Sequence, residues 1–203
     1  MTRPPERLPE RDAAIDAMLP NVPFDGWTTR ALRAGLAAAG MPEDEATLLF
    51  PGGAADMVAV FCDLADRRMC EAAAALSETR LTARVRAIIS LRLAMNRPHK
   101  EAIRRALAVL ALPGNTRTAS AITARTVDAI WHAAGDRSAD FSWYTKRVIL
   151  TAIYSAAVLF WLHDTSEDDA DTRAFIDRLL HGVGLLGRAR DRAGSLFGRL
   201  RPA

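Results

Sequence analysis

Two neighbouring segments decide the fold: GWTTRALRAGLAAAG, residues 26–40, and PEDEATLLFPGG, residues 42–53. The first begins with a threonine pair that can cap a helix and ends at Gly40, a residue type that commonly stops one. The second holds a short helical segment and a turn that leads into a long helix ending near Leu76. This spacing predicts a helix-turn-helix.

The remainder of the chain is also expected to be helical. Half of the 203 residues are hydrophobic but only 6% are aromatic, and the dominant alanine, leucine and arginine lose little rotamer freedom in a helix. We therefore expect an all-α bundle with helices at residues 10–19, 29–39, 43–49, 53–76, 82–95, 98–111, 116–134, 143–163, 168–184 and 188–200. The expected organisation is a disordered N-terminus (1–9), a helix-turn-helix-like region (10–76), a lipid-binding helical body (77–184) and a basic amphipathic tail helix (185–203).

Charge is unevenly distributed along the chain. The net charge is +3, whereas residues 187–203 carry five arginines against Asp191, which makes +4. The other residues therefore carry −1, the difference between these two values. Such a neutral body lacks the positive field that gathers nucleic acid, so we expect no nucleic-acid partner and a tail that meets any anionic surface.

Residues with catalytic or metal-binding chemistry form no recognised pattern in the sequence. Glycines 182, 184 and 187 match the dinucleotide fingerprint but follow a predicted helix instead of a strand. The four histidines lack ligand spacing, so we expect no metal, no cofactor and no catalytic residue. An enzyme using His132 and Asp136 as an acid/base pair stays open as an alternative.

Cysteine usage and the N-terminus indicate the compartment. Cys62 and Cys70 lie on one predicted helix with about 12 Å of rise between them, too far for a disulfide, and are expected to be buried thiols in a reducing compartment. The first residues, MTRPPER, resemble neither a secretion signal nor a transit peptide. We expect a bacterial cytoplasmic protein.

The helix-turn-helix raises DNA binding as a function. The spacing of three short motifs is similar to that of TetR-type transcription regulators: Gly26-Trp-Thr-Thr29, Ala37-x-x-Gly40 and Leu49-Phe50. In such regulators the second segment enters the major groove, but here it begins Glu43-Asp44-Glu45, and carboxylates oppose contact with phosphates. We interpret the motif as vestigial, and a ligand-responsive DNA-binding regulator is the alternative.

Residues 131–147 gather aromatic and charged side chains in a chain with only four tryptophans and two tyrosines. Tryptophan and tyrosine at a helix junction typically anchor an interface. The block is therefore predicted to bind a partner, and a small core cluster under the loop is the alternative. Its members are Trp131, His132, Asp136, Asp140, Phe141, Trp143, Tyr144 and Arg147.

Several rare-residue motifs occur in a telling order: VPFDGWT at 22–28, FPGGAADM at 50–57, LADRRM at 64–69, TVDAIWH at 126–132 and WYTKR at 143–147. Over residues 11 to about 180, the chain resembles the ubiquinone-biosynthesis accessory proteins of the Coq-nine type. The resemblance implies a TetR-like helical fold without known catalytic activity. It also implies an apolar cavity for an isoprenoid quinone or phospholipid and a partnership with the demethoxyubiquinone hydroxylase.

The same resemblance assigns the partner surface, because the family contacts the hydroxylase around an Asp-Phe-x-Trp-Tyr motif. We extend the matching positions by two charged residues and one aromatic of the same block. The expected partner-binding residues are Asp140, Phe141, Trp143 and Tyr144, with Asp136, Arg147 and Trp131 added. By analogy with TetR-like proteins, which often dimerise through their last large helices, we expect a homodimer.

Residues 148–162 contain no charge, but a membrane crossing needs about 20 apolar residues. We expect a core helix that can line an apolar cavity. The residues expected to contact lipid are Tyr154, Val158, Phe160 and Trp161.

The tail follows the pattern of an interfacial helix, with apolar and basic residues on different faces, as in the family. We expect it to contact an anionic membrane through Arg188, Arg192, Leu196, Phe197 and Leu200. The protein would then be peripheral on the inner face of the bacterial cell membrane. Packing of the tail on its own body is the alternative.

Overall fold

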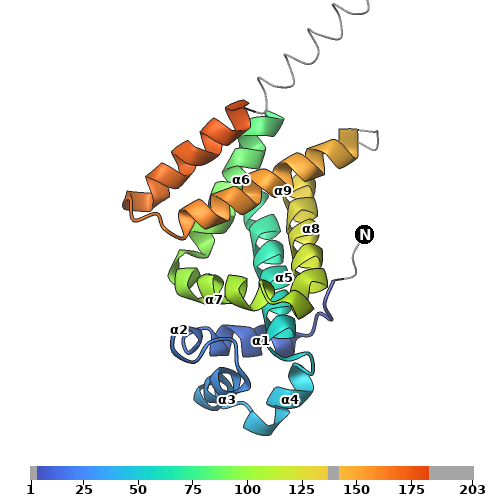
Figure 1. Ribbon diagram of the computed structural model, residues 1–203, viewed down its shortest axis with the longest axis vertical. Coiled ribbons are helices and arrows are strands. Elements are labelled where there is room, and N and C mark those ends of the chain that lie inside the picture. The colour runs from blue at the N-terminus through green and yellow to red at the C-terminus, as the bar shows by residue number, and fades with distance from the viewer. Residues whose placement is uncertain (1–3, 137–141, 183–203) are drawn as a thin grey trace, which may run out of the picture.

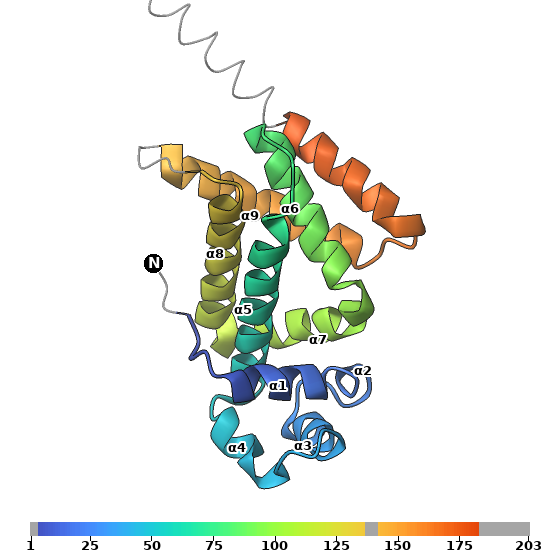
Figure 2. The ribbon, with the colours of Figure 1, turned by 180° about the vertical axis from the view of Figure 1, so that it is seen from behind.

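The computed structural model describes residues 4–136 and 142–182, without the side chains of Ser142 and Trp143. All regular secondary structure in these two ranges is helical (Figures 1 and 2). The all-α fold predicted from composition is therefore confirmed for the part of the chain that is described.

The α-helices follow one another along the chain as α1 (Pro9–Met18), α2 (Val22–Asp25), α3 (Thr29–Ala38), α4 (Ala46–Leu49), α5 (Gly53–Ala73), α6 (Leu81–Met95), α7 (Lys100–Leu110), α8 (Thr116–Ala133), α9 (Ser142–Trp161) and a last helix at residues 170–182. Short 3-10 helices each run directly into the helix that follows, at Glu43–Glu45, Arg97–His99, Pro113–Asn115 and Glu167–Asp169. The helix predicted at 188–200 lies outside the described residues.

Helix α2 is the one α-helix of the described ranges that sequence reasoning missed. Proline lacks the backbone N–H that a helix interior needs, and Pro20 indeed follows the end of α1. Pro23, however, lies in the first turn of α2, where a residue without a backbone N–H costs nothing because that donor has no intrahelical partner. Proline therefore marks the end of a helix at Pro20 and the beginning of a helix at Pro23.

The helix-turn-helix forms as the sequence predicts. Thr28 caps α3 by accepting a hydrogen bond from the backbone N–H of Ala31, with 3.2 Å between nitrogen and hydroxyl oxygen. Gly40 follows the helix with a φ of +69°, a left-handed conformation that favours glycine. Helices α1 to α4 gather at one end of the molecule, away from α9 (Figure 1).

Trp27 fastens this end to the rest of the molecule. Its indole N–H donates to the backbone carbonyl of Ala102 in α7 over 2.9 Å, a buried hydrogen bond between residues far apart in the sequence. Its ring lies 5.3 Å from that of Phe61 in α5, a tilted aromatic contact. A single tryptophan therefore joins the helix-turn-helix to two helices of the body.

Helix α5 runs through the middle of the molecule (Figures 1 and 2) and belongs to two hydrophobic cores. Its first half, including Met57 and Phe61, packs with α1 to α4, α7 and α8. Its second half, including Met69 and Ala73, packs with α6, α8, α9 and the last helix. The boundary that we predicted at residue 76 follows this helix, which spans both cores.

Arginine–aspartate pairs hold α1 and the residues before it against α5. Arg7 donates through Nε and Nη2 to Asp63 at 2.9 and 2.8 Å, and Arg67 links Asp63 to Asp12. Arg68 makes a two-pronged contact with Asp16 in the same interface. We expected residues 1–9 to be disordered, but Arg7 is anchored by this bidentate pair and Pro9 already belongs to α1.

Membrane-spanning potential is limited in the described ranges. No single helix there is long and apolar enough to cross a membrane. One pair, Glu43–Leu49 with Gly53–Ala73, passes by length and composition together but is bent by 83° at the break.

Gly35 allows α3 to approach α1 closely, and its replacement should destabilise the fold. A Cβ at this position would lie 2.6 Å from the carbonyl oxygen of Ala17 and 2.7 Å from Cα of Met18. Because both neighbours are backbone, we expect Gly35→Ala to lower the free energy of unfolding by about 1–3 kcal/mol in urea denaturation. Gly114→Ala is the control, since a Cβ there meets no atom within 4 Å; equal effects of the two variants would contradict this account.

Candidate functional site

An apolar cavity of about 220 Å³ opens among the helices of the body. Five helices contribute to its wall: α5, α6, α7, α8 and α9. The wall is mostly aliphatic and aromatic, and its inner part includes the fully buried Trp161 and the buried Leu93. Leu159, 56% exposed, and the exposed Ser155 form part of the rim on α9. The cavity therefore leads from the surface into the protein core.

The cavity collects three of the four residues expected to contact lipid. Tyr154, Val158 and Trp161 lie on one face of α9 because they are spaced by four and three residues, and all three line the wall. Phe160 lies on another face, where its ring stacks on Phe175 with 4.5 Å between centroids and 13° between planes. Including Phe160 in the cavity was an error of helical phase that the spacing rule could have prevented.

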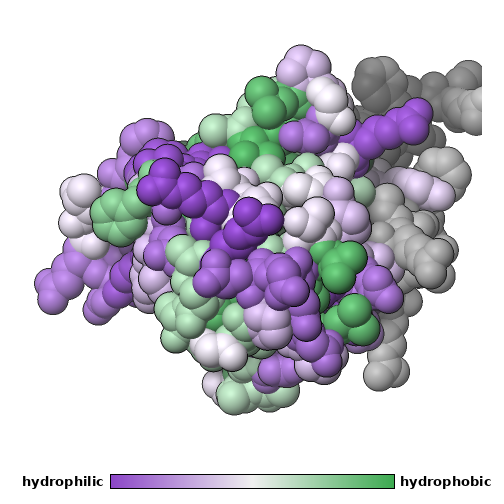
Figure 3. All heavy atoms as spheres, turned by 90° about the horizontal axis from the view of Figure 1, so that it is seen from below, coloured by the Kyte–Doolittle hydropathy of each residue, from purple (hydrophilic) through white to green (hydrophobic). Residues whose placement is uncertain are grey.

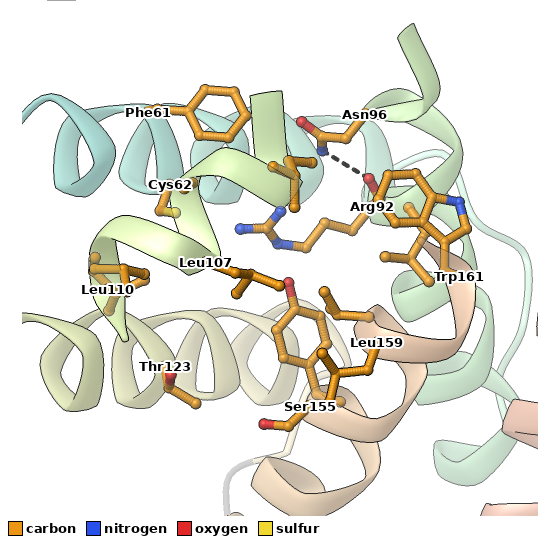
Figure 4. Close-up of a pocket in the computed structure, with 16 residues that line it drawn as sticks. Phe61, Cys62, Arg92, Asn96, Leu107, Leu110, Thr123, Ser155, Leu159 and Trp161 are labelled. Atoms are coloured by element: carbon orange, nitrogen blue, oxygen red, sulfur yellow. Dashed lines mark hydrogen bonds between the residues drawn. The ribbon is translucent and has the colours of Figure 1, made fainter. Parts of the chain in front are cut away.

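One cation reaches into this apolar space. Figure 4 shows Arg92 extending from α6 between Cys62 and Leu107. Its Nε and Nη2 atoms lie 3.0 and 2.7 Å from one carboxylate oxygen of Asp66, and the other oxygen accepts from the Thr126 hydroxyl at 2.9 Å. Arg92 and Asp66 are 6% and 7% exposed, so this is a buried ion pair beside an apolar cavity.

The electrostatics keep the neighbours of this pair in their neutral forms. Burial by itself lowers the pKa of Arg92, but the interactions with its neighbours, Asp66 foremost, together raise this pKa by a larger amount. The net shift is upward, so the guanidinium stays charged. Burial raises the pKa of Asp66, and Arg92 and Thr126 oppose that shift. Burial also raises the pKa of Tyr154 and of Cys62 to about 12 each. At neutral pH the Tyr154 hydroxyl and the Cys62 thiol therefore stay protonated.

Sequence reasoning did not single out Arg92 or Asp66, although a signal existed. Val85, Ile88 and Arg92 recur at helical spacing, and the two aliphatic residues are fully or almost fully buried. A charged residue that continues an apolar face is the mark of a buried ion pair or of a site.

The partner-binding residues that can be placed gather where α8 ends and α9 begins. Tyr144 on α9 is 71% exposed, and Asp136 accepts a hydrogen bond from Lys146 at 3.3 Å. Arg147 forms an ion pair with Asp128 of α8. Asp140 and Phe141 lie outside the described residues, as does the side chain of Trp143.

Trp131 lies at the same junction and lines a second cavity of about 190 Å³. Lys146 is 5.9 Å from the centre of its ring, and its buried indole N–H has no hydrogen-bond partner within the described ranges. Lys146 and Ile149, which also line this cavity, were not part of the predicted surface. Lys146, Ile149 and Ile153 are spaced by three and four residues and so share one face of α9, which is the signal that could have found them.

The helix-turn-helix end presents acidic groups where a DNA-binding helix would need basic ones. Glu43, Asp44 and Glu45 are all exposed, and α4 adds the exposed apolar Leu48. Seen from below, this end combines hydrophilic surface with separate hydrophobic spots (Figure 3). The exposed carboxylates agree with a scaffold that does not contact phosphates.

Other chemistry can be assessed in residues 4–136 and 142–182. No group of three or more histidine, cysteine, aspartate or glutamate side chains there could hold a metal ion. Both cysteines are free thiols. The residues predicted to contact membrane, from Arg188 to Leu200, lie outside these ranges.

Known proteins that are similar to this chain indicate its family. The COQ9 family model matches residues 116–187. The ubiquinone biosynthesis protein COQ9-B, mitochondrial, of Xenopus laevis is 33% identical over 199 residues, which cover 94% of this chain and 67% of that protein. The chain belongs to the COQ9 family. The resemblance inferred from the sequence motifs is thereby confirmed.

Two further COQ9 relatives show how much of the family protein is present. The human ubiquinone biosynthesis protein COQ9, mitochondrial, is 32% identical over 182 residues, which are 85% of this chain and 57% of the human protein. The probable ubiquinone biosynthesis protein coq9, mitochondrial, of Dictyostelium discoideum is 42% identical over 94 residues, or 46% of this chain and 31% of that protein. The chain thus spans less than two thirds of these two relatives.

The fold of this COQ9 family member is that of a TetR regulator. The crystal structure of the TetR transcriptional regulator from Nitrosomonas europaea superimposes with a TM-score of 0.69 over 88% of this chain and 99% of that one, at 23% identity. The predicted TetR-like bundle is therefore confirmed.

The effects of substituting Arg92 and Asp66 on the free energy of unfolding should depend strongly on each other. Arg92→Met leaves the Asp66 carboxylate without its partner, and we expect a loss of about 3–5 kcal/mol in the free energy of unfolding. Adding Asp66→Asn, which removes the charge and keeps an oxygen for Thr126, should restore most of this loss. Urea denaturation measures both.

The matched control for the ion pair is Arg86→Met on the same helix. Arg86 pairs with Asp177 at the surface with 3.4 Å between nitrogen and oxygen, and both side chains are nearly half exposed. Such a pair contributes about 0–1 kcal/mol. A loss in Arg92→Met no larger than in Arg86→Met would contradict the account.

Proposed function

We propose that the protein is a non-catalytic lipid-binding accessory protein of ubiquinone biosynthesis, which presents the polyprenyl quinone intermediate to the demethoxyubiquinone hydroxylase at the membrane. The observation that carries the proposal is the apolar cavity walled by α5 to α9. Its aliphatic and aromatic wall suits an isoprenoid quinone or phospholipid, because burying each CH₂ group away from water contributes about 0.8 kcal/mol.

Family membership supports the pathway part of the proposal. The human and Xenopus relatives are named ubiquinone biosynthesis proteins, and these names describe them as mitochondrial. We extend the pathway role to this chain through the 33% identity that covers 94% of it. For this chain we propose a peripheral position on the inner face of a bacterial membrane, with the basic residues after Gly187 meeting anionic lipid.

The presentation step is supported by the two sites that share α9. Tyr144 lies near the start of this helix, and Tyr154 lines the cavity ten residues later. A rise of 1.5 Å per residue separates their Cα atoms by about 15 Å. A hydroxylase bound at the junction of α8 and α9 would therefore lie close to the lipid.

Filling the cavity should reduce the lipid that the protein retains. Val158→Trp places a large ring at the cavity wall, whereas Val148→Trp makes the same change on the same helix at a position that is 70% exposed. Native mass spectrometry of the purified proteins should show bound isoprenoid or phospholipid in the wild type and in Val148→Trp, and several-fold less in Val158→Trp. Equal lipid content in all three proteins, each folded by circular dichroism, would argue against the cavity as the lipid site.

The junction of α8 and α9 should be needed for the enzyme partner. Removing the exposed Tyr144 ring by Tyr144→Ala should weaken association with the demethoxyubiquinone hydroxylase about tenfold, because aromatic anchors dominate interfaces. The control is Phe24→Ala, since Phe24 is an exposed ring (83%) on α2 at the other end of the molecule. Pull-down that is unchanged by Tyr144→Ala, or reduced equally by both variants, would count against this surface.

A further inference from the structure

The mostly apolar wall of the main cavity contains one charged side chain, that of Arg92, and a few neutral polar ones, among them that of Tyr154. The guanidinium carbon of Arg92 lies 5.8 Å from the centre of the Tyr154 ring. The two side chains come from α6 and α9, so the fold brings them together from distant parts of the chain. An apolar lipid tail does not require a charged side chain and a hydroxyl group placed together in this way.

Each of these two side chains has a hydrogen-bond donor that no other residue of the described ranges uses. Asp66 occupies Nε and Nη2 of Arg92, and no residue in the described ranges accepts from Nη1. The Tyr154 hydroxyl has no hydrogen-bond partner there either, although its raised pKa keeps the proton on the oxygen. Two N–H or O–H donors beside an apolar space match an oxygen acceptor on an otherwise apolar molecule.

The charge balance selects among oxygen acceptors. Asp66 already neutralises Arg92 in a buried pair, and Cys62 beside them is neutral. An anionic head would therefore add one uncompensated charge to the protein interior, which is costly. A carbonyl oxygen adds no charge and accepts hydrogen bonds.

Position selects the orientation. Arg92 is buried at the inner part of the wall, whereas Leu159 and Ser155 are exposed at the rim. A ligand that reaches Arg92 with its oxygen must leave its apolar chain toward the rim.

We propose that the cavity takes a neutral lipid with its carbonyl-bearing head inward, and that Arg92 and Tyr154 donate hydrogen bonds to that oxygen. This inference rests on the proposed function, because it presumes that the cavity holds a lipid. It adds the chemical class of the head, its orientation, and two residues that determine specificity.

Three probes that share a decyl-substituted ring test the head. Decylubiquinone carries ring carbonyls, decylbenzene carries no oxygen, and para-decylbenzoate carries an anionic carboxylate. Titrations followed by native mass spectrometry give an apparent Kd for each with the full chain. We expect decylubiquinone to bind about tenfold or more tightly than either of the others.

Variants assign the preference to the two residues. Tyr154→Phe removes only a hydroxyl and should weaken decylubiquinone binding about threefold to tenfold while leaving decylbenzene unchanged. Arg92→Met with Asp66→Asn removes the ion pair as a whole and should abolish the preference for decylubiquinone. Arg86→Met, a surface arginine on the same helix, should keep it.

The outcomes separate this inference from the proposed function. Equal binding of decylubiquinone and decylbenzene, or equal weakening of both by Tyr154→Phe, would overturn the inward carbonyl and leave a lipid cavity in place. Tighter binding of para-decylbenzoate than of decylubiquinone would overturn the neutral head. Binding of none of the three probes would remove the lipid-binding function and the inference together.

Discussion

The structure depends on one helix that has to satisfy two cores. Helix α5 buries its first half against the helix-turn-helix end and its second half against the helices that carry the cavity. A further side of α5 is covered by the N-terminal segment and α1, because Asp63 binds Arg7 and Arg67 binds Asp12. A helix buried on most sides leaves little freedom for the elements around it. The cavity therefore sits in a rigid frame whose far end is fixed by Trp27.

The two ends of the molecule differ in their surface chemistry. The bundle superimposes on a TetR regulator over almost the whole of that chain, yet residues 43–45 are exposed carboxylates. Internal contacts hold the helix-turn-helix together and join it to the body, such as the Thr28 cap and the Trp27 hydrogen bond to Ala102. The exposed carboxylates at residues 43–45 belong to neither of the two cores. The fold and the surface chemistry are therefore separate properties, and the shared TetR-like fold does not by itself imply DNA recognition.

Sequence alone predicted the helices well, because their periodicity and caps are local properties. It missed α2, since a proline in a first turn gives the same signal as a proline that ends a helix. In the site, the apolar run at residues 148–162 pointed to α9, and helical spacing would have separated Tyr154, Val158 and Trp161, which line the cavity, from Phe160, which does not. Arg92 and Asp66 could be suspected from a charge on an apolar face, but their pairing depends on how α5 and α6 meet. That contact is a property of the tertiary structure, which helical spacing within a single sequence does not specify.

Helix α9 begins at the junction that carries Tyr144 and ends at the fully buried Trp161. One end of this helix is therefore at the surface, and the other end is inside the protein. If a lipid in the cavity changes the affinity for a protein at the junction by some factor, that protein must change the affinity for the lipid by the same factor. Release of cargo would then be set by the partner and not by the carrier alone. Under the proposed function, lipid delivery along this continuous helix would be a thermodynamic exchange, in which partner binding and lipid release are linked in one equilibrium.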